Sequence, residues 1–192
     1  MKVIKLLLIY TFFFLFTGCL TGPKNFTILY NKTDTGLSQL IDINGCYISQ
    51  FGCDSLFYSI FTFYPDGLFR IATASQLNPD LINCFKQAQH PEYCQYPVWG
   101  TYKLTGDTIR TQSIRPEGAG CIIFRDYLIL PDKQIINLSD YVEPEHTDLG
   151  YMKNYPSYTQ NNCPANATFI PLESKLNATE CPYYHKKWFN TK

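Results

Sequence analysis

The 192-residue chain has few of the residues on which most enzymes and nucleic-acid-binding proteins depend. Charged residues make up 17% of it, below the usual quarter, and it has only three histidines. It contains neither the Gly-x-Ser-x-Gly motif of a hydrolase nucleophile nor a Cys-x-x-Cys pair typical of zinc sites. We therefore expect a protein that is not an enzyme and that uses no metal or cofactor.

An apolar run long enough to span a membrane is also missing from the N-terminal region. Lys2 and Lys5 come before an apolar run from Leu6 to Phe16, whereas a membrane-spanning helix needs roughly 20 such residues. Small residues follow at positions 17 and 18. This is the layout of a signal peptide over residues 1–18, and it predicts an extracytoplasmic protein.

The expected cleavage site resembles the lipobox of bacterial lipoproteins, in which a small residue precedes a cysteine that is acylated. The resemblance implies a lipid such as palmitate on Cys19, which would hold the mature protein at a membrane of the cell envelope, the outer membrane in a bacterium. Phe16 stands where the lipobox usually has leucine. The alternative is an ordinary signal peptide and a secreted protein.

Charge excludes one class of partner. Removal of residues 1–18 leaves 14 basic and 16 acidic residues, whereas nucleic-acid binding normally needs a clustered basic face. We expect no nucleic-acid partner.

Eight cysteines in an exported chain predict disulfides, because compartments outside the cytoplasm are oxidising. Spacing favours Cys84 with Cys94, across a short polar insertion, and Cys163 with Cys181, near the C-terminus. If Cys19 is acylated, seven cysteines remain, and one of them is unpaired or bonds to another chain. If Cys19 is free, the count is even.

Aromatic residues are abundant, with 15 tyrosines and 14 phenylalanines, and these side chains favour β-strands. Short apolar runs alternate with turn sequences such as Pro65-Asp66-Gly67 and Pro131-Asp132-Lys133. The predicted strands cover residues 42–49, 56–64, 68–74, 98–104, 108–114, 121–130, 134–138 and 167–172. Pro79 is expected to begin a short helix in the insertion between strands.

The pattern divides the mature chain into three parts. Residues 19–40 are expected to be the lipid attachment site and a spacer, residues 41–140 an antiparallel β-barrel core, and residues 141–192 a loop-rich extension that packs on the barrel. On the strand from Val98 to Leu104, Tyr102 and Leu104 point to one side and Trp99 and Thr101 to the other. That alternation predicts one buried and one solvated face.

Three segments resemble the lipocalin-like, or calycin-like, small lipoproteins of Bacteroidetes. They are Gly45-Cys46-Tyr47, residues 63–67 (FYPDG) and residues 100–109 (GTYKLTGDTI). The resemblance covers about residues 41–140 and implies a mainly β fold, an antiparallel up-and-down barrel with a short helical insertion and a long C-terminal tail. Such folds host binding more often than catalysis.

Two functions follow as hypotheses. The first is a non-enzymatic envelope lipoprotein whose barrel binds a small apolar or amphipathic ligand between aromatic side chains. The second is a secreted, disulfide-stabilised structural or interaction module for a protein or glycan partner. A barrel interior filled by its own side chains would favour the second.

Three further features leave alternatives open. The acidic segment at residues 143–148, which contains His146, is either a metal ligand set or, more in keeping with its spacing, a solvated loop. The basic aromatic segment at residues 183–189 is either a binding site or a strap over the barrel. Five Asn-x-Ser/Thr triplets, which in a eukaryotic secretory pathway would make the protein a glycoprotein, begin at Asn25, Asn31, Asn137, Asn166 and Asn177.

Overall fold

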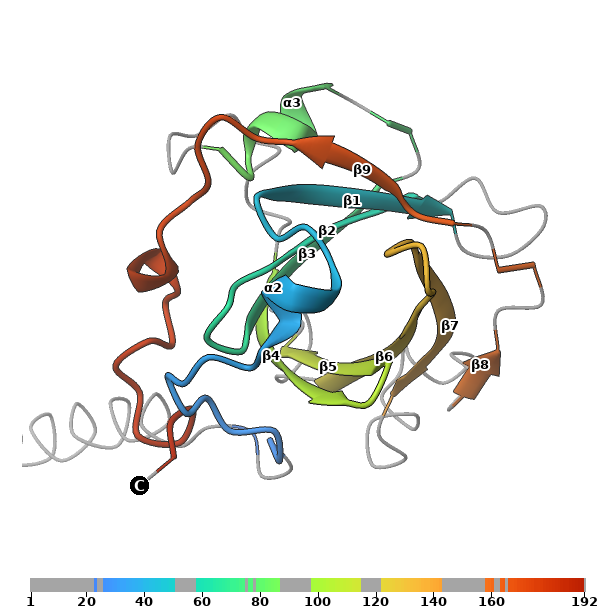
Figure 1. Ribbon diagram of the computed structural model, residues 1–192. Coiled ribbons are helices and arrows are strands. Elements are labelled where there is room, and N and C mark those ends of the chain that lie inside the picture. The colour runs from blue at the N-terminus through green and yellow to red at the C-terminus, as the bar shows by residue number, and fades with distance from the viewer. Residues whose placement is uncertain are drawn as a thin grey trace, which may run out of the picture.

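The computed structural model describes residues 23, 26–50, 58–74, 76–77, 79–86, 98–114, 122–142, 158–160, 163–164 and 166–191. In these residues the protein is mainly β, as expected, and its strands form a single curled antiparallel sheet consistent with a lipocalin-like barrel (Figure 1). No described helix is both long and apolar enough to cross a membrane.

Nine strands form this sheet in the order β8-β7-β6-β5-β4-β3-β2-β1-β9, and every neighbouring pair is antiparallel. Their bounds are β1 Gly45–Gln50, β2 Tyr58–Phe63, β3 Leu68–Ala74, β4 Val98–Thr105, β5 Thr108–Ile114, β6 Ile122–Ile129, β7 Ile135–Val142, β8 Tyr158–Gln160 and β9 Thr168–Pro171. The first seven follow one another along the chain, so the topology is up-and-down.

The curled sheet brings its two halves together through the segment before β9. Asn166 forms an isolated bridge with Ile136 of β7, and the backbone N–H of Ala167 donates to the carbonyl of Ile135 at 2.7 Å. The chain then continues into β9, which pairs with β1. These contacts link β7 to the β1 side and reduce the unpaired edge that an open sheet would expose.

The turns are those that the sequence predicts. Gly67 and Gly106 have φ values of 95° and 61°, the left-handed region that glycine adopts without steric cost. Lys133 has a φ of 66° in the β6–β7 turn, although it is not glycine. Gly100 is needed for a different reason: β4 and β5 approach closely there, and an added Cβ would lie 2.0 Å from the carbonyl oxygen of Gln112 on β5.

The barrel interior is filled at one end by aromatic rings, including rings of β2 and β6, which are not neighbours in the sheet. The Phe61 ring lies 4.7 Å from that of Tyr127 and 5.7 Å from that of Phe63, between centroids. The buried residues of this interior cluster are Leu37, Ile41, Tyr47, Phe61, Phe63, Phe69, Ile71, Tyr102, Ile109, Tyr127, Ile129, Ile135 and Ala167.

A buried ion pair lies further along the strands. Arg125, on the same face of β6 as Tyr127, donates from Nε to Asp140 of β7 at 3.0 Å. The Asn137 amide Nδ2 donates to the same carboxylate at 3.4 Å. Asn137 is 1% exposed, so this face of β7 is polar and still buried.

Residues 26–41 do not form the spacer that the sequence predicted. Phe26 and Tyr30 are buried, and the short helix α2 (Leu37–Leu40) inserts Leu37 into the interior cluster at one end of the barrel. In Figure 1 this helix lies across the mouth of the curled sheet. Residues 19–40 are polar and broken by Gly22, Pro23 and Gly36, a pattern that favours a tether.

The other boundaries shift less. The helix α3 (Pro79–Asn83) begins at proline as predicted, and the predicted strands match β1–β7 and β9 within a few residues. β7 continues to Val142, and β8 lies in a stretch that the sequence suggested was loop. The sheet therefore extends past residue 140 into the expected C-terminal extension.

Candidate functional site

The two ends of the described chain meet on the outside of the barrel. The backbone N–H of Tyr30 donates to the carbonyl of Phe189 at 2.8 Å, and that of Thr191 donates to the carbonyl of Tyr30 at 2.9 Å. These bonds form a parallel bridge between Tyr30 and Asn190. Residues 26–31 and 183–191, called the terminal segments below, thus make one unit, seen at the lower left of Figure 1.

The terminal segments are held on the sheet by a second group of rings, the outer aromatic cluster. Phe189 is fully buried, and its ring lies 5.3 Å from that of Phe26 and 5.8 Å from that of Tyr30. The cluster comprises Phe26, Tyr30, Tyr183, Tyr184, Trp188 and Phe189, and packs on Tyr64, Leu68, Trp99, Ile114, Ile122 and Phe124. Residues 183–189 therefore act as a strap over the sheet, one of the two predicted readings.

This packing changes the expected character of β4. Trp99 belongs to the outer aromatic cluster, and the Thr101 hydroxyl donates to the carbonyl of Ile28 at 2.5 Å. On β5, the Gln112 Oε1 accepts from the N–H of Ile28 at 2.7 Å. The face of β4 that carries Trp99 and Thr101 is thus covered by the terminal segments, while Lys103 on the same face is exposed.

A groove of about 590 Å³ lies over the junction of the terminal segments. Its volume is within the range of small-molecule sites. We call it the terminal groove. It is lined by Tyr30, Asn31, Lys32, Tyr184, His185, Lys187, Asn190 and Thr191.

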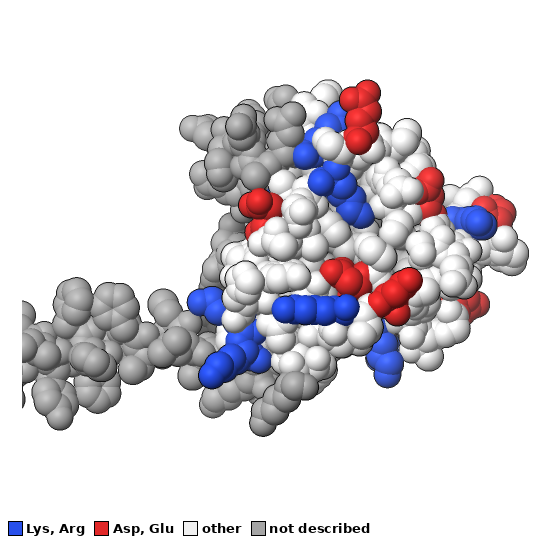
Figure 2. Space-filling view, turned by 60° about the vertical axis from the view of Figure 1, so that its left-hand side comes forward, with Lys and Arg blue, Asp and Glu red and all other residues white. Residues whose placement is uncertain are grey.

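The electrostatic character of the terminal groove is basic. Lys32, His185 and Lys187 are exposed lining residues, and none of the eight lining residues is acidic. Basic side chains also gather at the lower left of the face in Figure 2. An anion entering the groove would meet ammonium groups on two sides.

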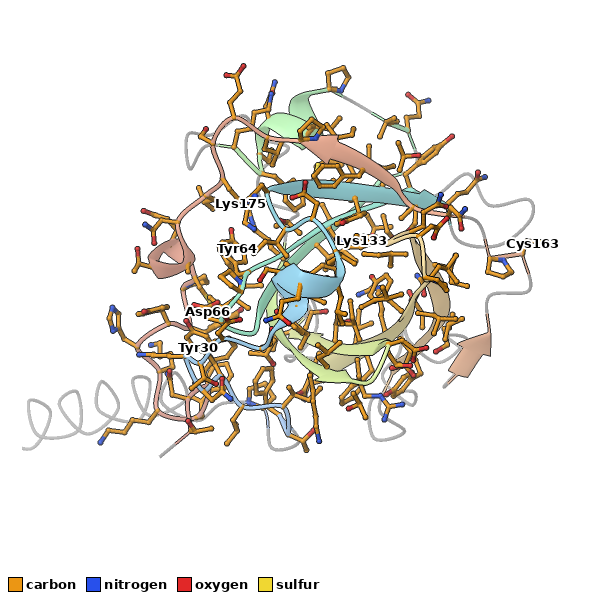
Figure 3. The ribbon with its side chains drawn as sticks, in the orientation of Figure 1. Tyr30, Tyr64, Asp66, Lys133, Cys163 and Lys175 are labelled. Carbon is orange, nitrogen blue, oxygen red and sulfur yellow. The ribbon has the colours of Figure 1, made fainter. Side chains whose placement is uncertain are left out.

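The lining residues are positioned by specific contacts. The Tyr30 hydroxyl donates to Asp66 in the β2–β3 turn at 2.5 Å, a pair that Figure 3 shows together. Burial, with Asp66 adding to it, raises the pKa of Tyr30 well above its usual value, so this hydroxyl keeps its proton. The Asn190 amide donates to the carbonyls of Tyr184 and Lys186 at 3.1 and 2.7 Å, which holds the turn carrying His185.

Lys32 has a backbone conformation that is unusual for a residue other than glycine. Its φ is 59°, in the left-handed region that costs a non-glycine residue roughly 1–2 kcal/mol. Its ammonium lies 4.5 Å from the centroid of the Tyr184 ring and 5.9 Å from that of Tyr30. Such cation–π contacts contribute about 0.5–1 kcal/mol at exposed sites. The left-handed backbone of Lys32 therefore goes together with a position of its ammonium over the groove.

A different basic residue is half-buried beside the outer aromatic cluster. The Lys175 ammonium donates to the carbonyls of Ile43, at 2.8 Å, and Phe63, and lies 4.2 Å from the Tyr64 ring centroid (Figure 3). Burial lowers the pKa of Lys175 to about 8. Its contacts connect the C-terminal segment to the residue Ile43 before β1 and to the last residue of β2. These contacts indicate a structural role.

Arg70 is buried on the outer face of β3. Its Nη1 donates to the Cys84 carbonyl at 2.6 Å, and its guanidinium lies 5.1 Å from the Phe85 ring and 5.4 Å from the Trp99 ring. Burial lowers the pKa of Arg70. The residue joins α3 to the outer aromatic cluster and lies outside the terminal groove.

The cysteines differ in part from the predicted pairs. Cys84 and Cys163 each belong to a disulfide, whereas Cys181 is a free, buried thiol, so the predicted pair of Cys163 with Cys181 is wrong. Cys181 packs in the outer aromatic cluster, which the spacing of cysteines could not reveal. Cys94 lies outside the described residues, so its pairing with Cys84 stays a prediction.

Cys46 is a second free and buried thiol. Burial raises the pKa of Cys46 to about 11 and that of Cys181 to about 12. Both thiols are thus protonated at neutral pH and are poor nucleophiles. They behave as small apolar core residues.

Several predicted features cannot be placed. Cys19, His90 and the acidic segment at residues 143–148 lie outside the described residues, while His185 lines the terminal groove. Within the described part of the chain, no three His, Cys, Asp or Glu side chains gather to form a metal site.

The sequence indicated one half of the groove but missed the other. Residues 183–189 were singled out by their aromatic and basic character, whereas Tyr30, Asn31 and Lys32 were assigned to the spacer. A tyrosine followed by a lysine in a polar segment was the available signal, and it is too common to be specific. Comparisons with protein-family models, curated proteins and solved structures find no match to this chain.

Proposed function

We propose that this protein is a non-enzymatic, extracytoplasmic interaction module that binds an acidic glycan in the terminal groove. The observation that carries the proposal is the groove's lining, which combines three basic side chains with two tyrosine rings and has no acidic residue. Sulfate and carboxylate groups of a glycan would pair with the ammonium groups. Sugar rings would pack against the exposed part of the Tyr184 ring, since Tyr30 is buried.

The interior of the barrel supports this choice over an apolar ligand inside it. The described interior at the α2 end is occupied by rings at contact distance, with Phe61, Phe63 and Phe69 each 0–1% exposed. An apolar ligand would have to displace such rings, and a close-packed interior resists rearrangement. The groove needs no rearrangement.

The localisation of the protein is part of the same proposal. Export over residues 1–18 and a lipid on Cys19 would hold the barrel at a membrane surface with the groove available to glycans there. Without the lipid, the same module would be secreted. The proposed binding does not depend on which of the two applies.

The test is retention on immobilised heparin, a sulfated polysaccharide, at about physiological salt. The variant Lys32→Glu/Lys187→Glu reverses two charges of the groove. The matched control Lys103→Glu/Lys133→Glu reverses two exposed charges on β4 and in the β6–β7 turn. Because a hydrogen bond to a charged group contributes about 1.5–3 kcal/mol, the groove variant should bind at least roughly tenfold more weakly.

Three outcomes would contradict the proposal. They are no retention of the wild-type protein, equal losses in the groove and control variants, and stronger binding to polyglutamate than to heparin. The last result would point to an acidic protein segment as the partner. A neutral dextran column serves as the uncharged reference.

A further inference from the structure

The five Asn-x-Ser/Thr triplets occupy very different environments, and the structure separates them. Asn31 and Asn177 are exposed, and so is Asn166, whereas Asn137 is 1% exposed on the buried face of β7. Asn25 lies outside the described residues. Identical motifs therefore differ in whether the folded protein has room for a sugar.

Asn177 has the local geometry of an acceptor. Its Oδ1 accepts from the N–H of Thr179 at 2.9 Å and from the hydroxyl of Thr179 at 2.8 Å. The third residue of the triplet thus contacts the side-chain amide that would be modified. The same side chain also caps the short 3₁₀ helix Ala178–Glu180 at the surface.

Asn31 has a similar arrangement at the edge of the terminal groove. Its Oδ1 accepts from the N–H of Thr33, the third residue of its triplet, at 3.2 Å. The side chain is exposed. A glycan there would extend from the groove's rim, next to Lys32.

Asn137 is the opposite case. Its amide donates to Asp140, which is paired with Arg125, and Ser139 of the same triplet is 2% exposed. A sugar on this amide would displace the ion pair and leave a charge without its partner, which strongly destabilises a folded chain. A folded chain cannot carry a glycan at this position.

We propose that Asn31 and Asn177 are N-glycosylation sites and that Asn137 is never modified in the folded protein. The donor is a lipid-linked oligosaccharide of a eukaryotic secretory pathway, so this inference rests on the secreted form of the protein and not on the bacterial lipid anchor. The asparagine Nδ2 forms a C–N bond to the anomeric carbon, and the sugar–phosphate C–O bond breaks. The lipid pyrophosphate leaves with that electron pair, and the amide loses one proton.

The experiment is intact-mass measurement of the protein from its native host, before and after enzymatic release of N-glycans. Thr33→Ala and Thr179→Ala each destroy one triplet on the surface, and each should lower the number of glycans by one. The matched controls Thr33→Ser and Thr179→Ser keep the triplets and should keep the wild-type number of glycans. Ser139→Ala should leave the number unchanged.

Unchanged mass of the wild-type protein after glycan release would overturn the inference, as would loss of a glycan in Ser139→Ala. Full glycan numbers in either threonine-to-alanine variant would remove that site from it. Because glycosylation is read by mass and heparin binding by retention, this inference and the proposed function can fail separately. Heparin retention of the glycan-free protein shows whether the groove binds by itself.

Discussion

The barrel interior and the outer aromatic cluster use the same kinds of side chain but draw them from different parts of the chain. The interior rings of Phe61, Phe63 and Phe69 come from two strands joined by one tight turn. The outer cluster joins Phe26 to Phe189, which lie near opposite ends of the sequence. The first region is assembled from local pairing, the second from contacts across the whole chain.

This difference has a consequence for function. The interior rings pack against one another, against Leu37 of α2 and against aliphatic residues of the strands, so they contribute to stability. The outer aromatic cluster borders the terminal groove on one side. There the side chains of Lys32, His185 and Lys187 are exposed to solvent. A cluster built from the two ends of the chain thus supports both the fold and the terminal groove.

The largest expected effect is in the interior. Phe61→Ala would remove a fully buried ring that packs against the rings of Tyr47, Phe63 and Tyr127. Such truncations destabilise a protein by about 3–5 kcal/mol. Denaturant unfolding should show this loss in a single transition. Hydrogen exchange should accelerate for amides in all of β1–β7, and protection that persisted in these strands would contradict a single cooperative interior.

Phe189→Ala should have a smaller and more local effect. We expect a loss of about 3 kcal/mol, because the ring lies on the outer face of the barrel and its neighbours can close in part. The Tyr30 and Thr191 amides should exchange about 100-fold faster, while those of β5 and β6 keep their protection. Heparin retention should fall as well. Equal acceleration in the strands would show that the two clusters unfold together.

Lys175 connects the two regions and makes stability depend on pH. Its folded pKa of about 8 lies below the ordinary value of 10.5. Between these values the unfolded chain binds more protons, so the free energy of unfolding should rise with pH, by at most about 1.4 kcal/mol per unit. Below pH 8 the charged amine is destabilising, because burial disfavours it.

The measurement compares the wild-type protein with Lys175→Met from pH 7 to 10.5. Taking the difference removes the contributions of buried tyrosines and cysteines, which are common to both proteins. The variant should lose the rise in stability between pH 8 and 10.5. The same slope in both proteins would mean that Lys175 titrates normally.

The smallest effects on stability are expected at the two lysines with positive φ, where binding and stability can be measured separately. Lys32→Gly and Lys133→Gly both relieve a left-handed backbone, at φ 59° and 66°, against the entropy cost of glycine. Each should change stability by less than about 1 kcal/mol, in the stabilising direction. Only Lys32→Gly should weaken heparin binding, because Lys133 lies outside the terminal groove. Equal binding by both variants would place the site elsewhere.

Much of the sheet could be predicted because its signals are local. Proline and aspartate at the turns after Tyr64 and Leu130, with Gly67 in the first of them, specify backbone angles within four residues, and aromatic runs between the turns favour strands. The short strand β8 gave no such signal, being three residues long. The groove could be predicted only from its C-terminal half, since Tyr30 and Lys32 acquire their role from residues near the other end.

The sequence alone determined the mainly β class, the order of the hairpins and the helix that begins at Pro79, because each depends on neighbouring residues. Tertiary structure alone decided that residues 26–41 pack on the barrel, that Cys181 is free and buried in the outer cluster, and that Asn137 is enclosed. The reason is physical: burial depends on contacts between distant segments, which leave no period in the sequence and follow from how the whole sheet curls.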